Sequence, residues 1–286
     1  MVDEHDQDWI GDFMGSFHAR AGNVFERDDV IKCERHGDTP TKVYRAPDGE
    51  LVGLKCPDCL QEAAREREVE EARIEAAERA RRRIENSMKG AMIPERFKSR
   101  TLENYEATSG GKQEAVLEFC KQYAANFDKA LDAGTSVIFS GGVGTGKTHL
   151  SVGIAHAVIA NGYTAIFSTV SGMVRHIRST WRSEEETELD AMRMYITPSL
   201  LILDEVGLQS GSDNEHQILF EILNSRYERC RPTILLTNLP IRDQLENGVV
   251  TKKGLQSFIG DRLLDRMREG GGKAFTFDWQ SGRIGR

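Results

Sequence analysis

The pattern of apolar and polar residues divides the chain into four segments. In residues 91–286 short apolar runs alternate with helical patterns, which predicts an α/β domain with a parallel sheet flanked by helices. Residues 61–90 are almost purely Ala, Glu and Arg, and their alternating charges predict one long, solvated helix. In residues 31–60 the runs TKVY and LVGLK flank a PDG turn and predict a small β-hairpin. Residues 1–30 lack a clear period and are interpreted as a weakly ordered arm that a partner could order.

Composition and charge narrow the class of protein. The chain has 286 residues, 39% of them apolar, which is enough for one large core and a small accessory domain. It has no run of eighteen apolar residues, and its acidic start lacks the features of a signal peptide, so we expect a cytoplasmic protein without a membrane partner. A net charge of -7 argues against indiscriminate coating of DNA, so contacts with nucleic acid would come from local basic patches.

A glycine-rich loop, GGVGTGKT, lies between a predicted buried strand and a predicted helix. This order disfavours a chance glycine-rich turn, and the Lys-Thr pair excludes an NAD-binding turn. Such a loop wraps a polyphosphate with backbone amides and a helix N-terminus. Lys147 is expected to bridge the outer phosphates, and the Thr148 hydroxyl to ligate magnesium. The residues predicted to bind ATP here are Gly141, Gly142, Val143, Gly144, Thr145, Gly146, Lys147, Thr148 and His149.

Two later apolar runs end in polar residues. The run SLLILDE places Asp204 and Glu205 at the carboxyl end of a strand, where open α/β sheets bind ligands. Asp204 is expected to hold magnesium through water, and Glu205 to orient and polarise the attacking water. The alternative is a solvated acidic strand end. The run PTILLTN ends in Thr237 and Asn238 at the same predicted edge, where they could hold that water or sense the third phosphate.

Several arginines could complete this site. The segment GDRLLDRMREGGG places Arg262 and Arg266 four residues apart on one helical face, with both guanidiniums exposed. Phosphoryl transfer gains from an arginine delivered in trans, which would make the active form an oligomer. The alternative is a pair of surface arginines that bridge to nearby acidic residues. In the tail WQSGRIGR, Arg283 could reach back to the nucleotide.

Four potential metal ligands flank the predicted hairpin. Cys33 and His36 are spaced C-x-x-H, Cys56 and Cys59 are spaced C-x-x-C, and nineteen residues separate the pairs. Three thiolates and one imidazole would close a structural zinc site, which argues against catalysis there, and so small a segment would need the metal to fold. The alternative is an unmetallated loop with incidental cysteines. The two remaining cysteines are predicted to be core residues: Cys120 and Cys230.

The motifs GGVGTGKT, LLILDEVGLQSG, RPTILLTNL, GDRLLDRMREGG and FTFDW together resemble the bacterial DnaC-type helicase loaders and the related IstB-like transposition ATPases. The resemblance covers residues 92–286 and implies an AAA+ ATPase fold. It implies these roles: an arginine finger at Arg266, assisted by Arg262; a first sensor at Asn238; a second sensor at Arg283; and adenine contacts from Ile93 and Phe97.

The resemblance also implies contact with single-stranded DNA between the glycine-rich loop and the acidic strand. The segment MVRHIRSTWRS combines positive charge with an aromatic platform for stacking a base, through Arg175, Arg178, Trp181 and Arg182. From the residues alone, a basic amphipathic helix is more often a solvated face. The first sixty residues differ from the helicase-binding head of chromosomal loaders, and the likeness to zinc-headed loaders implies a phage or prophage source.

These observations predict an ATP-dependent loader of the DnaB-type replicative helicase onto single-stranded DNA during replication initiation. The zinc module and the charged helix are expected to grip the helicase, and ATP to favour a spiral homo-oligomer. The expected cofactors are ATP, Mg²⁺ and Zn²⁺. Two alternatives are open: an IstB-like regulator of transposition, and a zinc DNA-binding protein with a structural nucleotide site.

Overall fold

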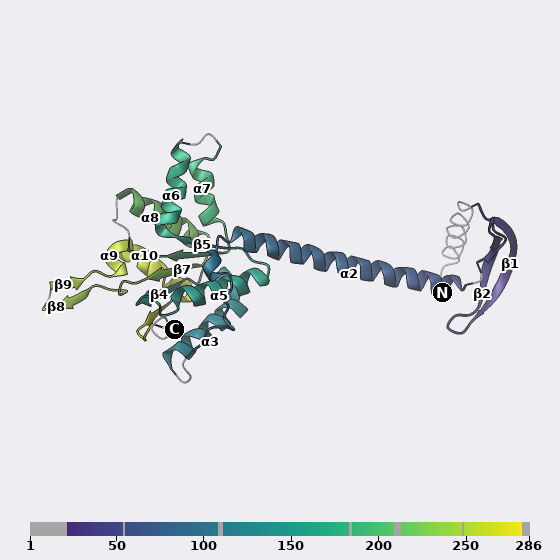
Figure 1. Ribbon diagram of the computed structural model, residues 1–286, viewed down its shortest axis with the longest axis horizontal. Helices are drawn as coiled ribbons and strands as arrows, with labels where there is room; N and C mark the ends of the chain where they lie inside the picture. Colours follow the sequence, from purple (N-terminus) through teal and green to yellow (C-terminus); the bar gives the residue numbers. More distant parts are fainter. Residues whose placement is uncertain are drawn as a thin grey trace. The chain divides into compact units, whose positions relative to one another are not determined.

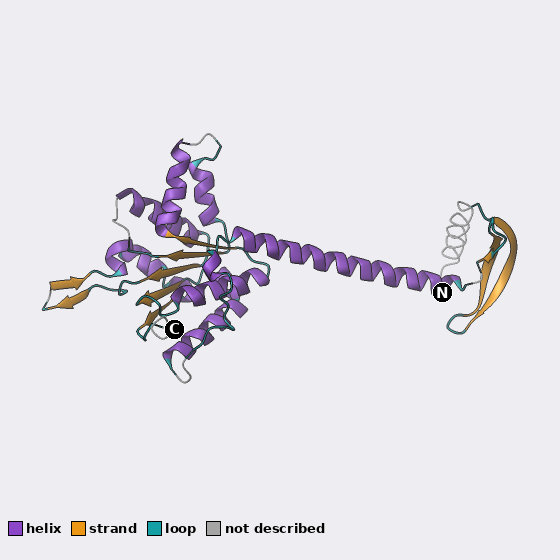
Figure 2. Ribbon diagram, viewed as in Figure 1, coloured by secondary structure: helices purple, strands orange, loops and turns teal. Residues whose placement is uncertain are grey.

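The structure, a computed structural model, describes residues 22–53, 55–107, 111–182, 185–208, 213–247 and 249–281. The chain divides into two compact units, residues 1–79 and residues 80–286, which are described one at a time (Figures 1 and 2). Most of the predicted arm, residues 1–21, lies outside the described residues. No helix in the described part of the chain is both long enough and apolar enough to cross a bilayer.

The N-terminal unit contains a three-stranded antiparallel sheet in the order β1-β2-β3. Its strands are β1 (Val24–Cys33), β2 (Gly37–Arg45) and β3 (Leu51–Val52). The hairpin predicted around the PDG turn is confirmed, because β2 pairs with β3 and Arg45 lies opposite Leu51. Val43 and Tyr44 are among the few buried apolar side chains of this sheet. So small a core needs a further source of stability.

The first strand corrects the predicted boundary of the arm at residue 30. β1 begins at Val24 and pairs with β2 as far as Cys33 opposite Gly37. Five of its ten residues are charged, and most are exposed. A strand of this kind carries no apolar alternation, so the sequence pattern did not reveal it.

The predicted charged helix is confirmed as α2 (Pro57–Gly90), a continuous helix of 34 residues with no buried side chain. Pro57 suits its first turn, where a missing N–H costs nothing. The helix is not only a linker, however. Ile84 and Met88, four residues apart, pack against the core of the larger unit, which begins at Ala80 rather than near residue 90.

The larger unit is built on a five-stranded parallel sheet in the order β10-β4-β7-β6-β5. These strands are β4 (Val137–Gly141), β5 (Ala165–Thr169), β6 (Leu200–Asp204), β7 (Thr233–Thr237) and β10 (Lys273–Phe277). A separate antiparallel pair is formed by β8 (Gln244–Glu246) and β9 (Val249–Lys252).

Helices cover both faces of this sheet (Figure 2). One face carries α3 (Lys112–Ala125), α4 (Phe127–Ala133) and α5 (Lys147–Ala160). The other carries α6 (Val170–Ser179), α7 (Glu188–Ile196), α8 (Asp213–Glu228), α9 (Leu255–Ile259) and α10 (Asp261–Arg266). Short 3₁₀ turns are η1 (Glu95–Phe97), η2 (Thr180–Arg182) and η3 (Glu269–Gly271).

Alternate residues of each strand supply the two cores. Val137 and Phe139 of β4 face one core, whereas Ile138 faces the other, as the period of a strand requires. The predicted α/β class is therefore confirmed. Cys120 is buried as expected, but Cys230 is exposed, because it lies in the turn after α8 with a positive φ of 50°.

Arg226 is completely buried between α7, α8, β6 and β7. Its Nη1 donates to the carbonyl oxygens of Tyr195, Ile196 and Pro198, each at 2.9 Å. Its Nη2 donates to the carbonyl of Pro232 at 2.6 Å. Burial lowers the pKa of the guanidinium to about 9. The side chain therefore ties the end of α7 to the starts of two central strands.

Replacing Arg226 with Met is expected to lower the free energy of unfolding by about 3 kcal/mol or more, because several buried carbonyls lose their donor. Urea denaturation followed by circular dichroism measures the loss. Arg229→Met, at an exposed arginine of the same chain segment, is the control and is expected to change stability by less than about 0.5 kcal/mol. Equal midpoints for the two variants would contradict the role given to Arg226.

Candidate functional site

The glycine-rich loop connects the end of β4 to the start of α5, as predicted. Two of its glycines have no room for a side chain. A Cβ on Gly141 would lie 2.3 Å from the carbonyl oxygen of Phe277, and one on Gly146 would lie 2.7 Å from the Tyr105 ring. Both glycines also have positive φ angles, 148° and 97°. The loop therefore holds a backbone conformation that leaves its amides available to an anion.

Lys147 and Asn238 meet in this loop. The Lys147 ammonium donates to the carbonyl oxygens of Gly141 and Gly142, both at 2.7 Å, and to Asn238 Oδ1 at 3.0 Å. Asn238 directly follows β7, so two motifs 91 residues apart in the sequence meet at one sheet edge. Thr237, in contrast, turns away: its hydroxyl donates to the carbonyl of Val206 at 2.7 Å. Only Asn238 of the predicted polar pair therefore reaches the loop lysine.

The predicted magnesium ligands also lie together. Thr148 Oγ1 donates to Asp204 Oδ2 at 2.9 Å. Asp204 Oδ1 accepts from the backbone amide of Glu205 at 2.7 Å. Oxygen donors of this kind fit Mg²⁺, which binds carboxylates together with substrate phosphates. Glu205 is exposed and has a positive φ of 61°, a strained conformation that places its carboxylate at the edge of the sheet.

The residues around the loop include two that the sequence did not reveal. Trp279 Nε1 donates to the carbonyl of Thr145 at 2.9 Å, and the Tyr105 hydroxyl approaches the same oxygen at 3.5 Å. The predicted nucleotide contact His149 binds elsewhere: its Nε2 lies 2.9 Å from the carbonyl of Thr101. Burial lowers the pKa of His149. Its imidazole therefore holds the segment around Thr101 against α5, and nucleotide contact by His149 stays a prediction.

Ile93 and Phe97 belong to the core next to α5. Ile93 is buried, and the Phe97 ring lies 6.5 Å from the ring of Phe167 on β5. The 3₁₀ turn that contains Phe97 contacts α5, the helix that starts at the glycine-rich loop. Adenine contact by this pair stays a prediction.

The two arginines of α10 differ. Arg262 is exposed, whereas Arg266 is half-buried, with its guanidinium 4.8 Å from the centre of the Tyr227 ring. Tyr227 in turn donates its hydroxyl to Glu269 at 2.5 Å. The expectation of two exposed guanidiniums therefore holds for Arg262 but not for Arg266, whose guanidinium is partly covered by a cation–π contact. Arg283 lies outside the described residues.

The predicted DNA-binding residues are only partly available. Arg175 is exposed on α6, and Trp181 is 53% exposed, although its Nε1 donates to Glu188 at 3.0 Å. Arg178 forms an ion pair with Glu215 of α8 at 3.5 Å, so a DNA phosphate would have to compete with this carboxylate. The side chain of Arg182 lies outside the described residues.

The four predicted metal ligands converge in the N-terminal unit. Their ligand atoms all lie within 4.8 Å of one another. Cys33 Sγ is 3.5 Å from Cys59 Sγ, and His36 Nδ1 is 3.4 Å from Cys59 Sγ and 3.7 Å from Cys56 Sγ. Tetrahedral zinc with Zn–S bonds of about 2.3 Å separates its ligands by about 3.7 Å. The donor set and its spacing therefore fit a structural zinc ion.

A carboxylate on α2 supports the imidazole. His36 Nε2 lies 3.2 Å from Glu62 Oε1, which leaves Nδ1 for the metal. The sequence analysis missed Glu62, although it lies three residues after Cys59 and so on the same helical face. The backbone amides of His36 and Arg35 lower the pKa of the Cys33 thiol to about 6. A thiolate is the form that binds metal.

The sheet order, the glycine-rich loop and the acidic strand end define a P-loop ATPase of the AAA+ type. Residues 66–269 match the family described as IstB-like ATP binding protein. The chain belongs to this family of IstB/DnaC-like AAA+ ATPases. The predicted family is thereby confirmed, and residues before 66 lie outside the matched region.

Relatives and solved structures agree with this assignment. A protein named replicative helicase loader DnaC from Buchnera aphidicola subsp. Baizongia pistaciae is 34% identical over 192 residues, 67% of this chain and 72% of that protein. Its namesake in Escherichia coli (strain K12) is 30% identical over 183 residues, 64% and 69% of the two chains. The crystal structure of the DnaC helicase loader matches with a TM-score of 0.53 at 20% identity, over 65% of this chain and 100% of that one, which shows a shared fold.

Proposed function

We propose that this protein is an ATP-dependent loader of the replicative helicase onto single-stranded DNA. The observation that carries the proposal is a pair of contacts at one sheet edge: Lys147 with Asn238, and Thr148 with Asp204. The chain is also similar to proteins named replicative helicase loader. An intact site of this composition is suited to hydrolysis rather than to passive binding of a nucleotide.

Bound MgATP supplies the phosphoanhydride that is cleaved. Lys147 exchanges its loop carbonyls for phosphate oxygens and neutralises their charge, while Thr148 and Asp204 offer oxygen ligands to the metal. Glu205 orients and polarises the attacking water from the exposed edge. Asn238, already in contact with the lysine, is placed to respond to the third phosphate.

A neighbouring subunit completes this site in trans. Arg266, with its side chain held over Tyr227, acts as the arginine finger, and the exposed Arg262 assists it. The loader therefore assembles when ATP is bound, and loss of the third phosphate weakens the assembly. Arg175 and Trp181 are the residues of α6 and η2 that offer a charge and a stacking surface to single-stranded DNA.

The zinc module supplies the contact with the helicase. On β1 it exposes three apolar side chains, Val24, Phe25 and Val30, at 69%, 51% and 60%. Apolar side chains gathered on an exposed strand favour a protein partner. This module precedes the region matched by the family, which fits a part that determines the particular partner.

Co-purification with the host's replicative helicase, with and without ATP, tests the proposal. The full chain is expected to capture the helicase in a nucleotide-sensitive manner, and a chain lacking residues 1–79, which leaves the ATPase unit intact, is expected to lose capture. ATP binding by the shortened chain is the control for its folding. No complex under any condition would contradict a helicase loader and favour the second candidate, a regulator of transposition, which the family description accommodates equally.

A further inference from the structure

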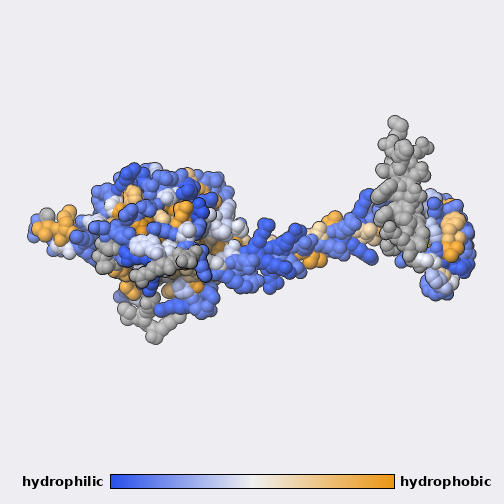
Figure 3. All heavy atoms as spheres, turned by 90° about the horizontal axis from the view of Figure 1, so that it is seen from above, coloured by the Kyte–Doolittle hydropathy of each residue, from blue (hydrophilic) through white to orange (hydrophobic). Residues whose placement is uncertain are grey.

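The strands β8 and β9 form an arm that projects from the ATPase unit (Figure 1). All of their residues are exposed. Three apolar side chains lie on the arm, namely Leu245, Val249 and Val250, with exposed fractions of 62%, 66% and 46%. Figure 3 shows this hydrophobic surface at the tip. The arm is the β-hairpin of residues 244–252, of which residue 248 is not described.

The base of the arm, in contrast, is firmly held. The Asp243 carboxylate accepts from the Gly254 amide at 2.7 Å and from the Ser257 hydroxyl at 2.7 and 2.8 Å. The Leu255 amide donates to the carbonyl of Pro240 at 2.8 Å. The two ends of the arm are thus fixed side by side. Because an isolated two-stranded hairpin is only marginally stable in water, an arm with a fixed base and an apolar tip is suited to contact another surface.

The position of the arm in the fold identifies that surface. All five strands of the main sheet are parallel, so β7 ends at the edge that gathers the nucleotide site. The arm begins at Gln244, six residues after Asn238. If a neighbouring copy supplies Arg266 to this site, as the proposed function requires, that copy covers the same edge and meets the arm.

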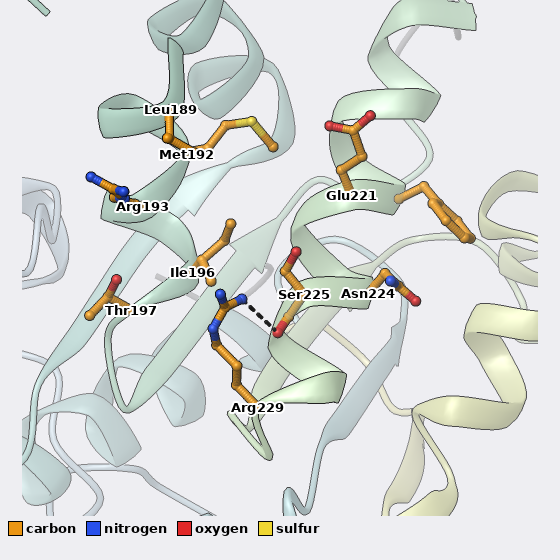
Figure 4. A pocket seen from close by; sticks show the side chains of 10 residues that line it. Leu189, Met192, Arg193, Ile196, Thr197, Glu221, Asn224, Ser225 and Arg229 are labelled. Carbon is orange, nitrogen blue, oxygen red and sulfur yellow. Dashed lines mark hydrogen bonds between the residues drawn. The ribbon is translucent and has the colours of Figure 1, made fainter. Parts of the chain in front are cut away.

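Helix α8, which carries the partner of Arg266, also lines a groove of mixed polarity with four apolar side chains, Leu189, Met192, Ile196 and Phe220. Arg266 stacks on Tyr227 of α8, and the same helix forms one wall of a cavity of about 490 Å³ whose other wall is α7 (Figure 4). Leu189 and Phe220, 56% and 37% exposed, lie at this groove together with Ile196. A copy that delivers Arg266 therefore brings this groove with it.

We propose that the arm of one copy docks in the α7–α8 groove of the copy that supplies its arginine finger. The inference rests on the proposed assembly in trans. Charge complementarity supports it, because the tip of the arm carries the acidic Glu246, whereas the groove is lined by two arginines, Arg193 and Arg229, and one acid, Glu221. The contact is head-to-tail, since arm and groove are different surfaces of the chain, and it can therefore build a chain of subunits.

Sedimentation velocity of the full chain with Mg²⁺ and a non-hydrolysable ATP analogue tests this contact. Leu245→Asp in the arm and Leu189→Asp in the groove are each expected to weaken self-association roughly tenfold or more, because each places a charge in an apolar contact. Both positions are exposed, so folding is expected to be retained, and equal binding of the analogue checks it. Val69→Asp, at a 69% exposed position of α2, is the matched control and is expected to assemble like the wild type.

Mixing the two defective chains gives a sharper result. The Leu189→Asp chain keeps an intact arm, and the Leu245→Asp chain keeps an intact groove. The mixture is therefore expected to form dimers but no assembly larger than a dimer. A monomeric mixture, wild-type assembly by the Leu245→Asp chain, or a wild-type chain that stays monomeric would each overturn the docking. Helicase capture is measured on the same preparations. If the wild-type chain does not capture the helicase, the proposed function is contradicted. If the wild-type chain captures the helicase but the two variants self-associate like the wild type, only the docking is contradicted.

Discussion

Replacing Glu205 with Gln is expected to lower steady-state ATP hydrolysis by about 100-fold or more while ATP binding is retained. The substitution keeps the size of the side chain but removes the carboxylate that is proposed to polarise the attacking water at the exposed sheet edge. Binding is expected to be retained because the proposed phosphate contacts, Lys147 and the loop amides, and the proposed metal ligands, Thr148 and Asp204, are unchanged. Phosphate release measures turnover, and equilibrium titration with a fluorescent ATP analogue measures binding.

Two further variants make the Glu205 result specific. Lys147→Ala is expected to abolish binding and turnover together, because the buried ammonium is the charge placed in the loop. Glu118→Gln, on the exposed surface of α3, is expected to change neither. Unchanged turnover in Glu205→Gln would assign the water to another group. No turnover even in the wild type would favour a zinc DNA-binding protein with a structural nucleotide site.

Replacing Cys56 with Ser is expected to remove the zinc ion and unfold the N-terminal sheet, while ATP turnover stays within about twofold of the wild type. The apparent free energy of binding for structural zinc in small peptides is about 10–16 kcal/mol, far above what the few buried side chains here can supply. Metal analysis gives the zinc content, and hydrogen exchange over β1 and β2 reports the unfolding. Helicase capture is expected to be lost with the fold.

Two controls accompany the Cys56 variant. Cys230→Ser removes an exposed thiol of the ATPase unit and is expected to leave the zinc content unchanged. Glu62→Gln weakens the support of His36 and is expected to lower zinc affinity by about 10–100-fold without abolishing binding. A Cys56→Ser chain that keeps one zinc ion, or that keeps protected amides in β2 without it, would contradict a folding role for the metal.

The strands and ligands with local signatures could be predicted from the sequence. β4, β6 and β7 are continuous apolar runs, and the polar residues that follow them meet because parallel strands end at one edge. The spacing of Cys33, His36 and the later cysteine pair likewise predicted a cluster, which the structure brings together. In each case the functional side chains lie within a few residues of the apolar run or the cysteine spacing that predicts them.

Features that depend on contacts distant in sequence could not be predicted. The cover over Arg266 comes from Tyr227, 39 residues earlier, and the partner of Arg178 comes from α8. Charged β1 forms because β2 lies beside it, not because of its own propensity. The arm of β8 and β9 buries none of its strand residues, so no core pattern marks it. These features are set by tertiary neighbours, which a single sequence does not display.

Zinc binding by the Cys33, His36, Cys56 and Cys59 cluster would have a second consequence, at the start of α2. Cys59 and Glu62 both belong to the first turns of this helix, and the Leu60 amide already donates to the carbonyl of Cys56 at 3.1 Å. Beginning a helix is its unfavourable step, whereas each later residue adds a hydrogen bond at little cost. A metal ion that fixes these residues acts as a nucleus from which an Ala-, Glu- and Arg-rich segment can propagate. Bound zinc would then favour the helical form of the first turns of α2, whereas the packing of Ile84 and Met88 fixes its last turns.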